Sequence, residues 1–253
     1  MKPKMMPGIA LALSLALVPN LAMAQMPLAS PAAAPVAPTL PMPAEKPELH
    51  YLAAADLLPQ RVLALPPVRA SDIEFDELAA LHAMIGQASP ERLAQAAKDD
   101  KLENPSIFND ALARDLTKLP QTWALLITVQ DEAGAAINIA KEAFGRERPY
   151  GIDETLPTCV PVDRTKAQRS YPSGHAGMGY SVAWVLARLM PQMAHVVLAR
   201  AQDYAQSRQL CGMHFPSDTE ASHVLGTLVA ERLLADPRLA TRIAAAKAEL
   251  AAN

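Results

Sequence analysis

The sequence predicts an all-α protein whose main part is a single compact helical domain. Between residues 71 and 252, apolar side chains recur at three- and four-residue spacing, the period of an amphipathic helix. Serine–proline pairs and a capping box mark helix starts, and no segment shows sustained strand alternation or a hairpin dipeptide. The chain is 51% hydrophobic and 19% charged, so it can form a buried core and is not disordered throughout.

The first 24 residues have the features of a secretory signal peptide. Lys2 and Lys4 form a basic start, the apolar run 8–18 follows, and Ala22-Met23-Ala24 matches the small-x-small pattern that signal peptidase recognises. The run is shorter than the roughly 20 residues that cross a bilayer, which favours a cleaved signal over an uncleaved anchor. We expect cleavage after Ala24, a periplasmic location and no transmembrane segment in the mature chain.

Residues 25–48 are rich in proline and alanine. Proline fixes φ and removes an amide donor, so this segment is expected to be an extended tether. The helical domain is then expected to occupy residues 49–253.

Helix start and stop signals divide this domain into a succession of helices. Ser71 with Glu74 forms a capping box, and Gly86 is a candidate end for the helix that it starts. Ser89 precedes Pro90, which suits the first position of the next helix. The expected helices begin near residues 71, 89 and 105 and then cover 121–148, 173–190, 192–210, 217–235 and 237–252.

Lys141 and Arg148 are seven residues apart in the long run 121–148. They are therefore expected on one face of a helix, two turns apart, where both cations can approach one anion. Pro149 helps to end that helix beside them. A pair of this kind, taken alone, is most often part of a solvated helix face.

Ser173 is expected to cap the following helix, with Gly174 and His175 in its first turn. Amides at a helix start have no partner within the helix and lie at the positive end of its dipole, so they can bind an anion. Gly174 leaves room for a ligand to contact the backbone, and His175 is placed to donate a proton to a bound group. A plain capped helix with an incidental histidine is the alternative.

A third block contains Arg208, His214 and Asp218. Asp218 can accept a hydrogen bond from Nδ1 of His214, which leaves Nε2 with a lone pair and makes the histidine nucleophilic. Arg208 offers two parallel donors to an oxyanion. The alternative is a surface His–Asp pair.

Together the blocks form a pattern far more specific than its parts: Lys-x6-Arg-Pro, then Pro-Ser-Gly-His after 22 residues, then Ser-Arg-x5-His-x3-Asp after 31. This pattern resembles the signature of the type 2 phosphatidic acid phosphatase (PAP2) superfamily, which includes acid phosphatases, lipid phosphatases and vanadium haloperoxidases. The Ser-Tyr-Pro-Ser-Gly-His block, the Cys-Gly-x-His segment and the exported start are most similar to bacterial class A non-specific acid phosphatases. The resemblance covers about residues 49–235 and implies a compact helical acid phosphatase domain.

The resemblance also implies a chemistry and a set of roles. Phosphate monoesters would be hydrolysed through a phosphohistidine intermediate, with no cofactor and no metal. His214 would be the nucleophile, Asp218 would orient it, and His175 would be the general acid that later activates water. The implied ligands of the phosphoryl oxygens are Lys141, Arg148, Ser173, Gly174 and Arg208, which suits the three equatorial oxygens of a phosphoryl group in transfer.

Four positions depart from the class A pattern. Arg169 replaces the glycine that usually precedes the second block, and Ala176 replaces the threonine that usually follows it. Met213 and Phe215 flank the nucleophile, where the family favours other aromatics. No phosphate ligand is lost, so the departures bear on the substrate pocket and the class rather than on the reaction.

Cys159 and Cys211 are the only cysteines. In an oxidising compartment they can pair, and closing a loop of this length stabilises a fold by roughly 4 kcal/mol in the loop-entropy model. We expect this disulfide; two buried thiols that do not meet are the alternative. Two cysteines cannot form a four-cysteine zinc site, and no cluster of cysteine and histidine indicates another metal site.

Charge and composition limit the partners. A net charge of -3 and 4% aromatic residues give neither a basic excess nor many stacking platforms, so nucleic acid is not an expected partner. Small phosphomonoesters are the expected substrates, and a homo-oligomer is left open. The alternative functions are a lipid phosphatase acting at the membrane surface, a vanadium-dependent haloperoxidase, and a catalytically silent protein that binds phosphate-bearing ligands.

The remaining histidines and acids near the blocks have no motif partners. They are expected to be structural or exposed, although the two acids upstream of Lys141 are candidates for shaping the pocket. These residues are His50, His82, His195, His223, Asp131 and Glu132.

Overall fold

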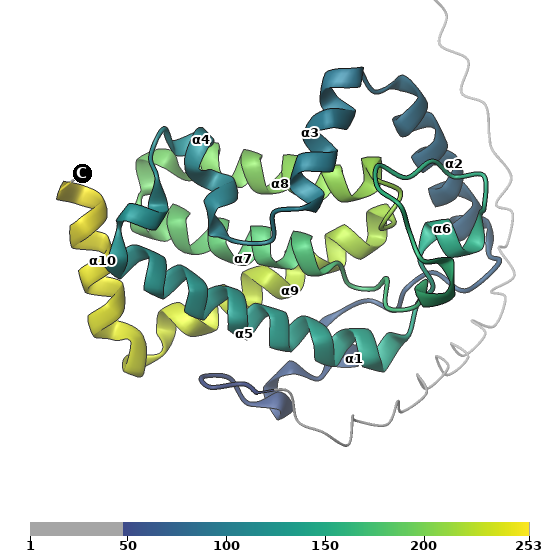
Figure 1. Cartoon of the computed structure of the whole chain (residues 1–253). Coiled ribbons are helices and arrows are strands. Elements are labelled where there is room, and N and C mark those ends of the chain that lie inside the picture. The colour runs from purple at the N-terminus through teal and green to yellow at the C-terminus, as the bar shows by residue number, and fades with distance from the viewer. Residues whose placement is uncertain (1–47, 253) are drawn as a thin grey trace, which may run out of the picture. The chain divides into compact units, whose positions relative to one another are not determined.

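The computed structural model of the chain describes residues 48–252 (Figure 1). The predicted signal peptide and nearly all of the predicted tether lie outside the described residues. Within them, the predicted fold class is confirmed: apart from an isolated antiparallel bridge between Glu147 and Gln168, the described residues contain no β-structure.

Four long helices form the core of the domain. They are α5 (Pro120–Phe144), α7 (Gly174–Leu189), α8 (Ala194–Leu210) and α9 (Pro216–Ala235). Helix α7 is central and packs against the other three (Figure 1). Its buried residues include Ala176, Gly177, Gly179, Ser181 and Ala183, whose small size lets neighbouring helices approach closely.

The contact between α7 and α9 depends on glycine. A Cβ atom on Gly226 would lie 2.8 Å from the carbonyl oxygen of Gly177, and one on Gly177 would lie 2.1 Å from Cδ1 of Ile137. A larger residue at position 226 would meet the backbone of α7 and force the two helices apart, whereas one at position 177 would require the Ile137 side chain on α5 to move.

The other helices surround this core. Helix α10 packs on α5, and α3 packs on α8 (Figure 1). The remaining helices are α1 (Pro59–Val62), α2 (Asp72–Gln87), α3 (Pro90–Asp100), α4 (Asn109–Leu112), α6 (Pro149–Ile152) and α10 (Ala240–Ala252), with short 3-10 turns between them.

The predicted helix starts at Ser71 and Ser89 are confirmed, because each hydroxyl accepts a hydrogen bond from the amide three residues later. The capping box is only half formed, since Glu74 binds the amide of Ala70 rather than that of Ser71. Helix α2 continues one residue beyond Gly86. The helix expected after Pro105 is a 3-10 turn followed by the single turn α4.

The prediction that one helix runs from 121 to 148 was wrong at its end. Helix α5 stops at Phe144 because Gly145 adopts a left-handed conformation with φ of 58°. The next residues pair with a later loop: the amide of Arg148 donates to Ala167 O at 2.7 Å, and that of Ser170 donates to Arg146 O at 2.8 Å. Arg148 therefore precedes α6 and does not share a helix face with Lys141.

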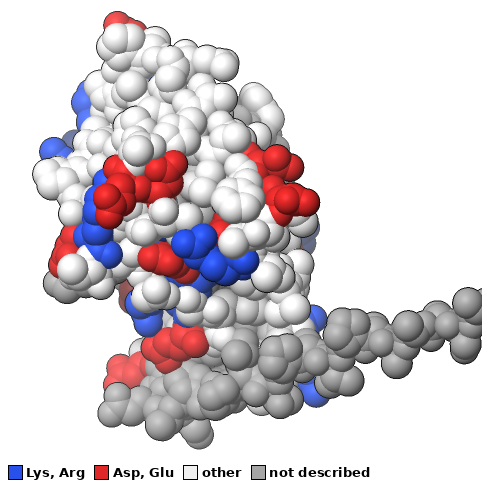
Figure 2. Space-filling view, turned by 90° about the vertical axis from the view of Figure 1, so that its right-hand side faces the viewer, with Lys and Arg blue, Asp and Glu red and all other residues white. Residues whose placement is uncertain are grey.

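Among the described helices, none combines the length and the apolar character required to cross a membrane. The face shown in Figure 2 presents Lys and Arg side chains next to Asp and Glu side chains. That face therefore has no large patch of a single charge.

Candidate active site

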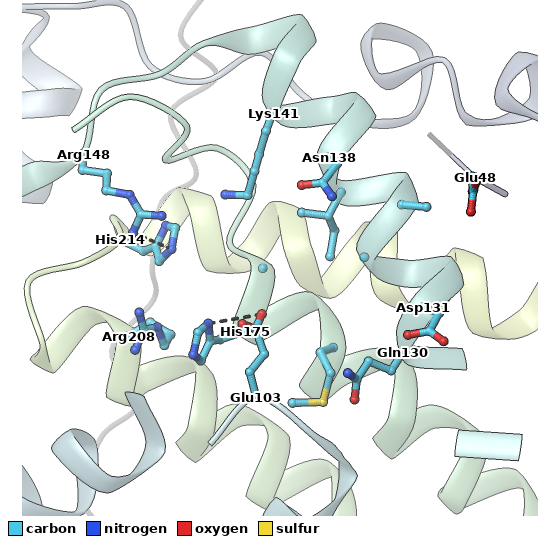
Figure 3. A pocket seen from close by; sticks show the side chains of 15 residues that line it. Glu48, Glu103, Gln130, Asp131, Asn138, Lys141, Arg148, His175, Arg208 and His214 are labelled. Atoms are coloured by element: carbon cyan, nitrogen blue, oxygen red, sulfur yellow. Dashed lines mark hydrogen bonds and ion pairs between the residues drawn. The ribbon is translucent and has the colours of Figure 1, made fainter. Parts of the chain in front are cut away.

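The predicted site residues meet at one end of the bundle, where four helices begin or end. Lys141 lies in the last turn of α5, His175 in the first turn of α7, Arg208 in the last turn of α8 and Asp218 in the first turn of α9. A cavity of about 730 Å³ opens there (Figure 3). The predicted residues that line it are Lys141, Arg148, Gly174, His175, Arg208 and His214.

His214 is buried, and its contact with Arg148 fixes its tautomer. Its Nε2 lies 3.2 Å from Nη1 of Arg148. A guanidinium nitrogen can only donate, so Nε2 is the acceptor and the proton of the neutral ring is on Nδ1. Burial, and after it Arg148 and Lys141, hold the pKa of His214 well below its usual range. The ring is therefore neutral, with its lone pair toward the cations.

Asp218 is fully buried behind this ring. Its Oδ2 lies 3.4 Å from Nδ1 of His214, but the N–H of that nitrogen makes no hydrogen bond within the described structure. The carboxylate accepts hydrogen bonds from the Ser170 hydroxyl at 2.5 Å and from the Phe215 amide at 2.9 Å. Burial raises the pKa of Asp218, and Arg146 opposes this shift. Asp218 is thus beside His214 as predicted, in ion-pair range rather than hydrogen-bonded.

Arg146 is a site residue that the sequence analysis missed. It is buried, and its Nη1 donates to Asp218 and to Ser217, each at 2.7 Å. Its Nη2 donates to Glu77 at 2.8 Å, and its guanidinium lies 3.9 Å from the centre of the Phe215 ring. Its place between Lys141 and Arg148 in the sequence was the one available signal.

The cavity's cations are held by backbone and by acids. Nζ of Lys141 donates to Arg169 O at 2.6 Å, and burial, followed by Arg148, lowers the pKa of Lys141 from 10.5 to about 7. Arg208 forms an ion pair with Asp100. The buried Nε of Arg208 has no hydrogen-bond partner among the described atoms, and the residue lines the cavity.

Arg169, one of the departures from the class A pattern, has a φ of 77°. This left-handed conformation favours glycine, which explains why glycine suits this position. The arginine side chain contacts Asn138 and Glu142 on α5. The carbonyl that binds Lys141 is therefore retained in spite of the substitution.

Ser173 caps α7, as predicted: its hydroxyl accepts a hydrogen bond from the Ala176 amide at 3.4 Å. Gly174 and His175 occupy the first turn, whose amides are not used within a helix. Both residues line the cavity, so the positive end of the α7 dipole faces it.

His175 is engaged on both ring nitrogens. Nε2 lies 3.0 Å from the carbonyl oxygen of Asp100, and Nδ1 lies 3.3 Å from Oε1 of Glu103. Burial, followed by Arg208, lowers the pKa of His175 to about 3. The segment that contains Asp100 and Glu103 was not identified from the sequence, because it belongs to no motif.

Cys159 and Cys211 form the expected disulfide, with their Cα atoms 4.6 Å apart. It ties the loop after α6 to the end of α8, three residues before His214. Among the described residues, the one group of side chains spaced like metal ligands is Asp100 with these cysteines, whose sulfurs are already bonded to each other.

The other end of the cavity is lined by polar and acidic side chains, including Glu48, Gln130 and Asp131 (Figure 3). Asp131 is exposed, which is one of the two outcomes that the sequence analysis left open for it. Glu132 is buried and is not solvated: its carboxylate accepts hydrogen bonds from the amides of residues 50, 51 and 52. It holds the start of the domain against α5.

The chain is similar to several known proteins. The model of the PAP2 superfamily matches residues 122–241. The non-specific acid phosphatase of Providencia stuartii is 31% identical over 216 residues, 81% of this chain and 86% of that protein. The acid phosphatase of Zymomonas mobilis is 31% identical over 176 residues, 67% of this chain and 66% of that protein. The crystal structure of LpxE from Aquifex aeolicus has a similar fold, with a TM-score of 0.50 and 19% identity over 61% of this chain and 92% of that one.

Proposed function

The chain belongs to the PAP2 superfamily, with non-specific acid phosphatases among its relatives, and from this premise we propose that it is an exported acid phosphatase. It hydrolyses phosphate monoesters through a phosphohistidine intermediate and needs no metal. The observation that carries the proposal is the convergence of two histidines and three cationic side chains on one cavity (Figure 3). These cations and the α7 amides supply the charge that a phosphoryl group in transfer requires.

In the first step, Nε2 of His214 attacks phosphorus while the bond to the leaving oxygen breaks. The neutral tautomer described above supports this role, because Nε2 has the lone pair. Arg148 donates to that lone pair, so the bound phosphoryl oxygens have to take over its N–H before attack. His175 supplies the proton to the leaving oxygen, an effect worth typically 10²–10⁴-fold in rate.

In the second step, water attacks the phosphohistidine and the P–N bond breaks. His175 now accepts a proton from water, since it lost its own in the first step. Asp218 stabilises the positive charge that His214 acquires when the phosphoryl group is attached, because its carboxylate lies 3.4 Å from Nδ1. Inorganic phosphate leaves, and the protonation states return to their starting values.

Three cations in one cavity would repel a divalent metal ion, and the acids that line the cavity lie mainly at its other end, away from His214 (Figure 3). The donor set therefore supports phosphoryl transfer on protein cations alone. The proposed test is an assay of the mature protein with a panel of phosphomonoesters, before and after exhaustive chelation. Equal activity in both conditions, inhibited competitively by phosphate or vanadate, is the expected result.

Other outcomes of the same assay separate the alternatives. Activity lost in chelator and restored by magnesium or zinc would overturn the metal-free mechanism. Hydrolysis confined to lipid phosphates in vesicles would favour a lipid phosphatase, and halide oxidation with vanadate and peroxide would favour a haloperoxidase. Amino-terminal sequencing of protein from the periplasm tests export, with Gln25 the expected first residue.

A further inference from the structure

Glu103 lies over the start of α7, beside the proposed acid. Its Oε1 is 3.3 Å from Nδ1 of His175, and a Cβ atom on Gly174 would lie 3.1 Å from the same oxygen. The carboxylate also lines the active-site cavity and points toward its interior (Figure 3). Glu103 is therefore within reach of both His175 and a ligand bound at the helix start.

The hydrogen bonds of His175 leave Nδ1 as the nitrogen available for proton transfer. A backbone carbonyl can only accept, so the Nε2–H group donates a hydrogen bond to Asp100 O and keeps its proton. Nδ1 then faces Glu103, and any proton that His175 gives to a leaving oxygen must come from Nδ1. The two groups lie in ion-pair range, so a proton held by either one faces the other.

The segment that carries Glu103 is fixed at three points. Asp100 forms an ion pair with Arg208 and accepts from His175, and the Tyr204 hydroxyl donates to Leu102 O at 2.6 Å. The Tyr204 ring also stacks on the His175 ring, with centroids 5.9 Å apart. Glu103 is thus anchored to both α7 and α8 by its neighbours.

The charges around the two groups separate their proton affinities. The Glu103 side chain is about half exposed, and its partial burial raises its pKa. Asp100 adds to this shift, whereas Arg208, Lys141 and Arg148 oppose it. The pKa of His175 is lowered to about 3 by burial and by Arg208. Without Glu103, the His175 imidazolium would lose its proton at low pH, whereas the Glu103 carboxyl retains a proton at acid pH.

We propose that Glu103 is a positioning residue that forms one proton-holding pair with His175, and that this pair, rather than His175 alone, supplies the proton for the leaving oxygen. This role rests on the proposed phosphatase function. When the bond between phosphorus and the leaving oxygen breaks, the shared proton passes through Nδ1 to that oxygen, leaving neutral His175 and the Glu103 carboxylate. The attacking water returns one proton to the pair in the second step.

The test is Glu103→Gln, which keeps the size of the side chain beside Nδ1 but cannot hold the proton. We expect kcat for an alkyl phosphate to fall about 10²-fold, with KM nearly unchanged, and kcat for 4-nitrophenyl phosphate to fall less than about tenfold, because nitrophenolate needs little protonation. The alkaline limb of the alkyl phosphate profile should move about one pH unit lower. A purely structural role would slow both substrates equally.

Two comparisons complete the experiment. In the variant carrying both Glu103→Gln and His175→Asn, the rate should match that of His175→Asn alone within about threefold, because residues that act as a unit are not additive. Asp131→Asn removes the same charge from the same cavity without touching His175, and should shift the alkaline limb several-fold less.

Two results would overturn the proposed pair while leaving the phosphatase function in place. One is a double variant in which the two rate losses multiply, and the other is a Glu103→Gln enzyme within about threefold of wild type on the alkyl phosphate. A wild-type protein that hydrolyses no phosphomonoester would overturn the proposed function itself, and the role of the pair with it.

Discussion

Nη1 of Arg146 donates a hydrogen bond to Oδ1 of Asp218 at 2.7 Å, and both side chains are almost entirely buried. Arg146 does not line the cavity. It binds the carboxylate of Asp218 behind His214 and, through Nη2, that of Glu77 on α2. It therefore links the carboxylate beside the proposed nucleophile to the outer helix α2.

Arg146→Ala should be strongly destabilising. It leaves two poorly solvated carboxylates, Asp218 and Glu77, without their cation, and removing one partner of a buried ion pair costs about 3–5 kcal/mol. Chemical denaturation measures the free energy of unfolding. Arg146→Lys retains the charge, but an ammonium group cannot bind both carboxylates as the guanidinium does. It should therefore lower the free energy of unfolding by less than Arg146→Ala. An alanine variant within about 1 kcal/mol of wild type would contradict this account of the network.

Lys141 should make phosphate affinity depend on pH near neutrality. Its pKa in the folded protein is about 7, against an ordinary 10.5, so it loses its charge as pH rises through 7. The unfolded chain binds more protons than the folded one between these values, so the contribution of Lys141 to stability rises with pH across that window. Phosphate binding favours the protonated amine and weakens above pH 7.

Titration calorimetry with inorganic phosphate, from pH 6 to 9, compares wild type with Lys141→Arg. An arginine stays charged, so its affinity should fall less steeply with pH, and the comparison cancels the ionisation of phosphate itself. Parallel curves for the two proteins would show that Lys141 keeps its charge throughout.

Arg169→Gly should be more stable than Arg169→Ala. Both remove the contacts to Asn138 and Glu142, but only glycine relieves the left-handed backbone at φ of 77°. The strain of about 1–2 kcal/mol is partly offset by the greater freedom of glycine in the unfolded chain, so the net difference should be about 0.5–1 kcal/mol. Thermal melts of the two variants test this, and equal midpoints would mean that the backbone there is not strained.

The helices were largely predictable from local signals. Ser89 before Pro90, and Ser173 before the glycine-rich start of α7, each satisfy amides at a helix start, and both caps are present in the structure. The end of α5 was missed because Pro149 was the predicted stop signal, whereas Gly145 already ends the helix with a left-handed conformation. Arg148 reaches the cavity from an extended segment, which its spacing from Lys141 could not indicate.

The site residues that lie in motifs could be identified from the sequence, whereas their supporting residues could not. Arg146, Glu103 and Glu132 act through contacts with segments far away in the chain, such as the 82-residue separation between Glu132 and His50. Isolated charged residues in a sequence are mostly solvated, so nothing local marked Arg146 and Glu132 as buried, or Glu103 as a neighbour of His175. Only the tertiary structure brings their partners within reach.

The central claim is that His214 accepts the phosphoryl group. Mass spectrometry after a rapid alkaline quench, with a phosphomonoester as substrate, measures where the group is attached, since phosphohistidine survives in base. We expect a phosphorylated His214 in wild type and none in His214→Ala, with turnover at least about 10³-fold lower and an unchanged melt. His223→Ala, at an exposed histidine that contacts Glu220, is the control and should behave as wild type. Phosphate found on another residue, or a His214→Ala enzyme that keeps more than about a tenth of the wild-type rate, would contradict the claim.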